Sequence, residues 1–153
     1  MELYLIQHGE AKSELEDPER PLTAQGTENI KKTARFFKQL SKGIDLIWHS
    51  GKKRAEQTAA ILKETLGTGI HMEICAGLAP NDDISIIKEK IETAEQDSIA
   101  LVGHLPHLSR LASDLLTGKR EMEIIRFKNA GIVCLSGESQ DWKLEWIITP
   151  GIV

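Results

Sequence analysis

The order of short apolar runs and amphipathic stretches constrains the fold of this chain more than any other feature. Four apolar runs have the length and composition of buried strands, at residues 3–7, 44–49, 70–75 and 98–103. Stretches with helical spacing follow them, at residues 23–40, 52–66, 85–93 and 106–116. Strands that alternate with helices predict an α/β fold with a mostly parallel sheet.

The last part of the chain has a different pattern. Residues 123–127, 131–136 and 143–148 read as strands with no helix between them, and residues 137–141 suit a hairpin loop. Strands that follow one another in this way predict an antiparallel edge. The expected architecture is a three-layer α/β/α sandwich with a mostly parallel central sheet and an antiparallel edge. A length of 153 residues suits one domain over residues 1–153.

Charge and composition exclude several classes of function. The net charge is −4 and the pI is about 5.7, and without a basic stripe nucleic-acid binding has no electrostatic support. Cys75 and Cys134 lie in apolar segments without a CxxC spacing, so they are expected to be buried thiols. No signal peptide and no apolar run of ~20 residues is visible, so the expected location is the cytoplasm, without a membrane partner.

Polar side chains follow three of the expected parallel strands. His8 comes after the first strand, His49 and Ser50 come at the end of the second, and His104 comes after the fourth. In open α/β sheets ligands bind beyond the carboxyl ends of the strands, so these segments are expected to meet at one edge. Two histidines beside Arg54, which starts a helix, suit an anion, and phosphate is the obvious candidate.

Four sequence blocks resemble the histidine phosphatase superfamily, to which phosphoglycerate mutases also belong. They occur in the family's order, as LIQHGEA at 5–11, PLTAQG at 21–26, SGKKRAEQTA at 50–59 and VGHLP at 102–106. The first block resembles the signature that usually reads Arg-His-Gly. The short chain, without a large insertion after the second strand, resembles the small phosphohistidine phosphatase branch of the superfamily.

The resemblance implies a mechanism that these residue types can perform. His8 is the expected nucleophile, which forms a phosphohistidine intermediate that water then hydrolyses. Gly9 lets the backbone approach the phosphate, and Arg54 offers a planar fork to two phosphoryl oxygens. His104, when protonated, adds a further donor to the transferring group. Arginine and histidine supply the positive charge, so no metal and no cofactor is expected.

Gln7 departs from the family pattern, because arginine normally stands at that position. Glutamine can donate a hydrogen bond to the phosphate but carries no charge, and a charge-assisted bond is roughly twice as strong. The loss is expected to slow catalysis by ~10²–10³-fold unless another residue compensates. Arg20, which precedes the second block, is the candidate for that compensation, with a solvated loop arginine as the alternative.

The general acid is not identified by the sequence. Six carboxyl groups are candidates, each with a solvated loop position as the alternative: Glu14, Glu16, Asp17, Glu19, Asp82 and Asp83. Without a dedicated acid, phosphohistidine is the favoured substrate, because its imidazole leaves far more readily than the alkoxide of a sugar phosphate.

The other histidines receive simpler interpretations. His107 is expected on the surface of the fourth helix, and His71 is expected to be a strand residue without chemistry. For His49, a supporting role behind the site and a purely structural role are equally favoured.

These observations lead to one favoured function and two alternatives. The favoured function is a phosphohistidine phosphatase that acts on a phosphohistidine-bearing protein, with activity reduced by Gln7. A small-molecule phosphomonoesterase of the same superfamily is the first alternative. A phosphate-binding or scaffold protein with weak catalysis is the second, and Gln7 is the feature that motivates it.

Overall fold

A computed structural model describes residues 1–40 and 43–153, which form one six-stranded sheet with helices on both faces. The strands are β1 (Glu2–Gln7), β2 (Leu46–His49), β3 (His71–Ile74), β4 (Ser98–Gly103), β5 (Ile132–Glu138) and β6 (Asp141–Ile148). The helices are α1 (Ala24–Leu40), α2 (Lys53–Leu66), α3 (Ile84–Thr93) and α4 (His107–Thr117).

The strand order is β3-β2-β4-β1-β5-β6. The four strands from β3 to β1 run parallel, whereas β5 pairs antiparallel with β1 and β6 pairs antiparallel with β5. The prediction of an α/β fold with a mostly parallel sheet and an antiparallel edge is therefore confirmed.

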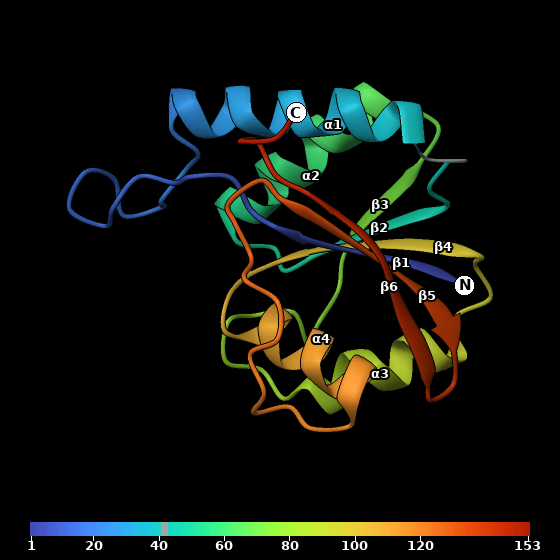
Figure 1. The fold of residues 1–153 in the computed structure, drawn as a ribbon. Helices are drawn as coiled ribbons and strands as arrows, with labels where there is room; N and C mark the ends of the chain where they lie inside the picture. The colour runs from blue at the N-terminus through green and yellow to red at the C-terminus, as the bar shows by residue number, and fades with distance from the viewer. Residues whose placement is uncertain (41–42) are drawn as a thin grey trace.

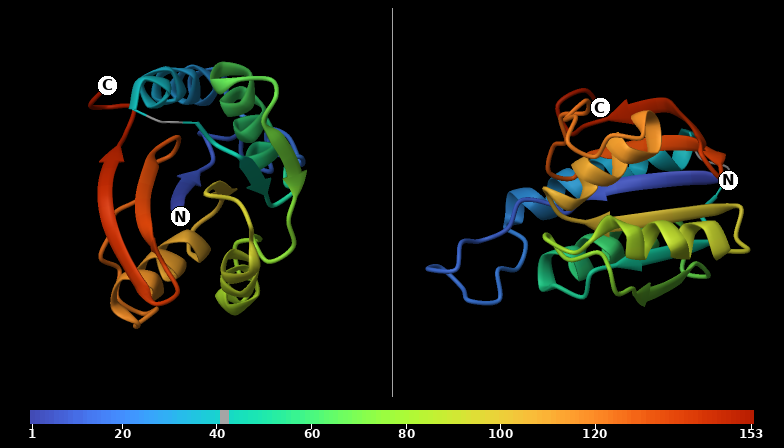
Figure 2. Two further views of the ribbon diagram at one scale, coloured as in Figure 1. Left: turned by 90° about the vertical axis from the view of Figure 1, so that its right-hand side faces the viewer. Right: turned by 90° about the horizontal axis from the view of Figure 1, so that it is seen from below.

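Two apolar cores separate the three layers. Helices α1 and α2 cover one face of the sheet, and α3 and α4 cover the other (Figures 1 and 2). Alternate residues of β1 enter opposite cores, because successive side chains of a strand point to opposite faces. Leu3 and Leu5 pack on the α3 and α4 side, whereas Tyr4 and Ile6 pack on the α1 and α2 side.

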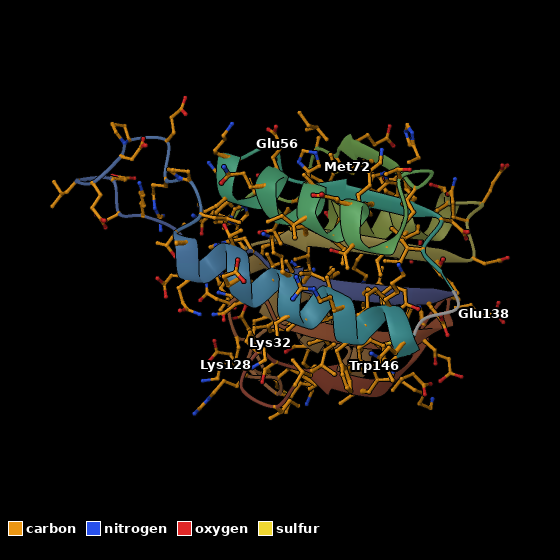
Figure 3. All side chains as sticks on the ribbon, turned by 90° about the horizontal axis from the view of Figure 1, so that it is seen from above. Lys32, Glu56, Met72, Lys128, Glu138 and Trp146 are labelled. Atoms are coloured by element: carbon orange, nitrogen blue, oxygen red, sulfur yellow. The ribbon has the colours of Figure 1, made fainter. Side chains whose placement is uncertain are left out.

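An aromatic cluster holds α1 on the sheet. The ring of Phe37 from α1 lies 4.7 Å from the ring of Tyr4 and 5.6 Å from the ring of Trp146, measured between centroids. Trp146 belongs to the edge strand β6 and lies beside α1 when the molecule is seen from above (Figure 3). This contact ties the antiparallel edge to the helix that follows β1.

The segment between β1 and α1 projects from the body of the molecule (Figure 1). Its base is closed by a bridge between Ala11 and Leu22 and by the bond from the Lys12 N–H to the Pro21 carbonyl, at 2.8 Å. Gly26 lets α1 approach this base, because a Cβ there would collide with the backbone carbonyl of Glu10. We call residues 11–22 the projecting loop.

Two details of the predicted strands are wrong. Residues 123–127 form no strand, although Ile125 and Phe127 are buried and alternate with exposed neighbours. They pack into the core on the α3 and α4 side, so their alternation reflects burial and not pairing. The last hairpin is also tighter than expected, since β5 and β6 leave only Ser139 and Gln140 between them.

Other predictions concern the thiols and the membrane. Cys75 and Cys134 are both free and buried, as expected. In the part of the chain that the structure describes, no helix has the length and apolar character needed to cross a membrane.

Candidate active site

The carboxyl ends of β1, β4 and β2 bring the predicted site residues together. β4 lies between β1 and β2 in the sheet, so His8 after β1, His104 after β4 and Ser50 after β2 are neighbours. The rings of His8 and His104 lie 5.0 Å apart between centroids. Arg54 lies in the first turn of α2, the helix that begins three residues after Ser50. The expected meeting of these segments at one edge is therefore seen in the structure.

The backbone fixes the ring of His8 in one tautomer. Nδ1 of His8 lies 2.7 Å from the carbonyl oxygen of Gly9. A carbonyl oxygen can only accept a hydrogen bond, so Nδ1 carries the proton and donates it. In the neutral ring, Nε2 then has a free lone pair. The backbone N–H of His8 also donates to the Gly103 carbonyl, at 3.1 Å, which joins the ends of β1 and β4.

His8 is neutral at pH 7 in this structure. Burial is the main cause that lowers its pKa to about 4; the positive charges of Arg54 and Arg20 act in the same direction, while the bond to the Gly9 carbonyl opposes them. A neutral imidazole with a free Nε2 is the form that can attack phosphorus.

His104 is almost completely buried, with 1% of its surface exposed. Its Nε2 lies 2.6 Å from the hydroxyl oxygen of Ser50, and its Nδ1 has no hydrogen-bond partner among the described residues. Burial is the main cause that lowers its pKa, to about 3, and nearby His8, Arg54 and Lys52 add to it. The ring is therefore neutral while the site holds no anion.

Arg54 is half-buried, and no ion pair or bond to its Nε is found within residues 1–40 and 43–153. Burial and the charge of Arg20 lower its pKa, whereas Glu14 opposes this shift. Beside it lies an open cleft of about 440 Å³ between the projecting loop and the start of α2. Its walls are formed by Glu14, Pro18, Glu19, Arg20, Gly51, Lys52, Lys53, Arg54 and Glu56. A half-buried guanidinium without a carboxylate partner suits an anion.

A threonine connects the backbone after His8 to α2. The backbone N–H of Gly9 donates to Oγ1 of Thr58 at 3.0 Å, and this hydroxyl donates to the carbonyl of Arg54 at 2.7 Å. A Cβ on Gly9 would lie 3.0 Å from the carbonyl oxygen of Gly26, so the close packing favours glycine. This packing role of Gly9 was not predicted, and its predicted role toward phosphate stays a prediction.

Gln7 is buried at the end of β1 and is poorly satisfied. Its Nε2 lies 3.5 Å from Oδ1 of Asn129, which is a long and weak bond, and its Oε1 has no partner within the described chain. Asn129 in turn donates to the carbonyl of His8 at 3.2 Å. The neutral amide therefore sits next to His8 where the resemblance implies a positive charge.

Arg20 lies at the edge of the same cleft as Arg54. Its Nε donates to the carbonyl of Lys12 at 3.1 Å, and its backbone has a positive φ of 50°. Its charge lowers the pKa of both His8 and Arg54, so it lies within electrostatic reach of each. Arg20 therefore lies beside the cleft that Arg54 also lines. The alternative, a solvated loop arginine, gives no reason for this position.

The candidate acids divide into two groups. Four of them are engaged in local structure: Asp82 accepts from Ala79 N–H, Asp83 caps α3 and contacts Arg120, Glu16 accepts from Ser13, and Asp17 accepts from Glu19 N–H. Of the six candidates, only the other two, Glu14 and Glu19, line the same cleft as Arg54.

The other histidines take no direct part in this arrangement. His107 is fully buried, so the prediction of a helix-surface position is wrong. The ring of His107 lies near the segment that contains Gly77 and Asp82, which faces the first turn of α4. His49 is buried, and its Nδ1 accepts from the Gly51 N–H at 3.2 Å, which stabilises the loop before α2. His71 is an exposed residue of β3.

Two residues at the site, Thr58 and Asn129, were not singled out by the sequence interpretation, and the contact of Ser50 with His104 was not predicted. Ser50, Thr58 and Asn129 each bond to a predicted site residue or to its backbone. Ser50 and Thr58 lie inside the third resembling block, which was a usable signal, whereas Asn129 follows an irregular segment that carried none. Within the described residues, no group of three or more His, Cys, Asp and Glu side chains is placed to hold a metal ion. The expectation of a metal-free reaction stays a prediction.

Comparisons with known proteins agree with this geometry. The sequence model of the histidine phosphatase superfamily (branch 1) matches residues 3–79. An uncharacterised protein of Picosynechococcus sp. is 35% identical over 141 residues, which covers 88% of this chain and 84% of that protein. The phosphohistidine phosphatase SixA of Escherichia coli is 24% identical, over 98% of this chain and 94% of SixA.

Solved structures resemble the fold over nearly its whole length. The protein histidine phosphatase SixA complexed with tungstate has a TM-score of 0.87 at 24% identity, covering 99% of this chain and 98% of that one. The alpha-ribazole phosphatase of Shigella flexneri has a TM-score of 0.79 at 17% identity, covering 98% and 97%. At such identities the likeness shows the fold alone. The names of these two proteins also give different substrates.

The fold, the edge with two histidines and the family match lead to one conclusion. The chain belongs to the histidine phosphatase superfamily, branch 1.

Proposed function

We propose that this protein is a phosphatase that transfers a phosphoryl group from phosphohistidine to Nε2 of His8. The observation that carries the proposal is the bond from Nδ1 of His8 to the Gly9 carbonyl, at 2.7 Å. This bond leaves Nε2 unprotonated in a ring whose pKa is lowered to about 4, beside a guanidinium that has no carboxylate partner among the described residues. A neutral nucleophile and a free cation are what phosphoryl transfer needs.

The reaction proceeds in two balanced steps. In the first step, the lone pair on Nε2 of His8 attacks phosphorus, the bond between phosphorus and the substrate nitrogen breaks, and the leaving imidazole takes up a proton from solvent water. In the second step, water attacks the phosphoryl group on His8, which releases inorganic phosphate and restores the neutral ring. Arg54 and a protonated His104 hold the phosphoryl oxygens as negative charge develops on them.

Phosphohistidine fits the acids that this site offers. A phosphate ester needs a carboxylic acid to protonate its leaving alkoxide, whereas an imidazole leaves without one. Four of the six candidate carboxyl groups are engaged in local structure, and the remaining two lie in an open cleft. The similarity to SixA, which is named a phosphohistidine phosphatase, supports the same substrate class. We infer a phosphohistidine-bearing protein as the partner.

A small-molecule phosphomonoesterase is the second candidate, and the position of Glu14 favours it. Glu14 lines the cleft and lies close enough to Arg54 to oppose the lowering of its pKa. If the Glu14 carboxyl carries a proton to an alkoxide, hydrolysis of phosphate esters depends on it. Glu16 belongs to the same loop but bonds to Ser13, so it offers a matched comparison.

The two candidates are separated by comparing free phosphohistidine with p-nitrophenyl phosphate. We expect kcat/KM to be at least about tenfold higher for phosphohistidine, and we expect Glu14→Gln and Glu16→Gln to leave phosphohistidine hydrolysis within about twofold of the wild type. Phosphate release is measured for both substrates with each variant. Preference for the ester, together with a loss of ester hydrolysis in Glu14→Gln alone, would establish the phosphomonoesterase instead.

Arg20 is proposed to bind the phosphoryl group together with Arg54, which partly compensates for Gln7. Replacing Arg20 by alanine is expected to weaken the binding of inorganic phosphate by about tenfold, because one of two nearby cations is lost. Titration calorimetry measures this affinity. Arg35→Ala, which removes an exposed arginine on α1, is the control and is expected to change it by less than twofold. Equal affinities in wild type and Arg20→Ala would show that Arg20 is only a loop residue.

A further inference from the structure

Ser50 makes a close contact with His104 across the sheet. Ser50 follows β2, and the register pairs His49 of β2 with Val102 of β4, so Ser50 and His104 leave neighbouring strands at the same edge. The Ser50 hydroxyl oxygen lies 2.6 Å from Nε2 of His104. The same oxygen accepts a hydrogen bond from the Lys52 N–H at 3.3 Å, which ties the hydroxyl to the start of α2.

Among the described residues, this contact is the one hydrogen bond of the His104 ring. The ring is buried, and Nδ1 has no partner in residues 1–40 and 43–153, so Nε2 makes its one hydrogen bond there. Apolar packing alone leaves the plane of an imidazole less well defined than a directional bond does. Removing the hydroxyl therefore frees the ring orientation.

The groups that face His104 all disfavour a proton on it. His8 comes from the end of β1, Arg54 and Lys52 come from the start of α2, and His107 comes from α4. With burial, these groups lower the pKa of His104 to about 3. A bound phosphoryl group brings negative charge next to the ring, and negative charge favours the protonated form. His104 is thus expected to gain its proton on anion binding.

A hydroxyl suits this change because it can donate or accept in one geometry. Toward the neutral ring, the Ser50 O–H can donate to Nε2 when the ring proton is on Nδ1, and the oxygen can accept when the proton is on Nε2. Toward the protonated ring, the hydroxyl hydrogen rotates away and the oxygen accepts from the Nε2 N–H. The oxygen has two lone pairs, so it keeps the bond from Lys52 N–H at the same time. No heavy atom has to move for the ring to be protonated.

We propose that Ser50 is a positioning residue that holds His104 and accepts a hydrogen bond from its Nε2 N–H when an anion is bound. This inference rests on the proposed function, in which a protonated His104 donates to the phosphoryl group. Ser50 acts through His104, so its removal affects the protonation of that ring more than it affects the nucleophile His8.

The direct test is a pH titration of His104, monitored by ¹⁵N NMR of its ring, with and without inorganic phosphate. In the wild type, we expect phosphate to raise the pKa of His104. In the phosphate complex of Ser50→Ala, we expect this pKa to be about one unit lower than in wild type, because the cationic ring loses its acceptor. Ser50→Thr keeps a hydroxyl and is expected to match the wild type, whereas Ser50→Val, which has the shape of threonine, is expected to match Ser50→Ala.

The kinetic readout follows from the same change. In Ser50→Ala, the alkaline limb of the pH profile of kcat for phosphohistidine is expected to move to lower pH by about one unit. In Ser50→Thr, the limb is expected to return to its wild-type position. Equal pKa values of His104 in the phosphate complexes of the folded threonine and valine variants would overturn the proposal. So would a loss of phosphate affinity that is the same at every pH, since this indicates packing alone.

The NMR titration uses inorganic phosphate and needs no turnover, so it tests Ser50 independently of the proposed reaction. If the protein does not hydrolyse phosphohistidine but His104 still titrates as described, the proposed function fails and the role of Ser50 toward a bound anion stands. If hydrolysis depends on His8 but the pKa of His104 is insensitive to Ser50, the role of Ser50 fails alone.

Discussion

Replacing His8 by alanine is expected to abolish phosphohistidine hydrolysis, with kcat lowered by ~10⁵-fold or more. The expected size follows from other enzymes in which the covalent nucleophile is removed and only binding and electrostatic stabilisation are left. Here those residual contributions are expected from Arg54 and His104, which lie close to each other and to position 8. Phosphate release from phosphohistidine measures the rate, and titration with inorganic phosphate shows whether the anion site is intact.

His71→Ala is the matched control, because His71 is an exposed histidine of β3 whose ring has Glu73 as its one hydrogen-bond partner within the described residues. We expect it to keep wild-type activity. Hydrolysis by His8→Ala within tenfold of the wild type would contradict the nucleophile assignment. The pH profile adds a second check, because the pKa of His8 is lowered to about 4. The acid limb of kcat/KM, which reports the free enzyme, is expected below about pH 5 and not near the usual 6.5.

Replacing Gln7 by arginine is expected to raise kcat/KM for phosphohistidine by ~10²-fold. The present amide carries no charge, its one bond to Asn129 is 3.5 Å long, and Oε1 has no partner in the described part of the chain. A guanidinium adds a charge-assisted contact to the phosphoryl group, and the loss of one such donor in other enzymes costs 10²–10³-fold. A positive charge beside His8 also lowers its pKa further, which keeps the nucleophile neutral.

The same substitution is expected to lower the stability of the protein in the absence of phosphate. A cation buried at position 7 is uncompensated in the empty site, so Gln7→Arg is expected to unfold at a lower temperature without phosphate. Phosphate is expected to stabilise this variant more than it stabilises the wild type, because it binds the folded state more tightly. Gln140→Arg places the same charge in the exposed turn between β5 and β6 and serves as the control. Unchanged or lower kcat/KM in folded Gln7→Arg would mean that Gln7 does not limit the rate.

Much of the fold could be predicted because its signals are local. Four apolar runs and the helices after them gave β1 to β4 and α1 to α4 to within a few residues. The sequence could not separate burial from pairing at residues 123–127, because Ile125 and Phe127 alternate with exposed residues as strand residues do. Pairing depends on whether a neighbouring strand edge is free, and the residues that decide this are far away in the chain.

The site was predictable where one rule of topology applies. The carboxyl ends of parallel strands meet, so His8, His104 and Arg54 could be assigned to one edge from their positions in the chain. The contacts between side chains were not predictable. Ser50 and His104 are 54 residues apart, and their contact depends on the order of β2 and β4 in the sheet.

His107 shows the same limit within a single helix. Position in the first turn of α4 suggests exposure, but the segment that contains Gly77 and Asp82 covers this turn and buries the ring. Whether a residue of a helix is exposed depends on what packs against that turn. The sequence of one helix therefore does not predict that a segment from elsewhere in the chain packs over it.

The proposed reaction requires that the phosphoryl group is carried for a time on Nε2 of His8. The protein is mixed briefly with phosphohistidine, quenched in alkali, in which phosphohistidine is stable, and digested for tandem mass spectrometry, with ³¹P and ¹⁵N NMR to assign the ring nitrogen. We predict one phosphoryl group, on Nε2 of His8, that is absent from His8→Ala. Steady hydrolysis with the phosphoryl group on another residue, or activity that persists in His8→Ala, would contradict it.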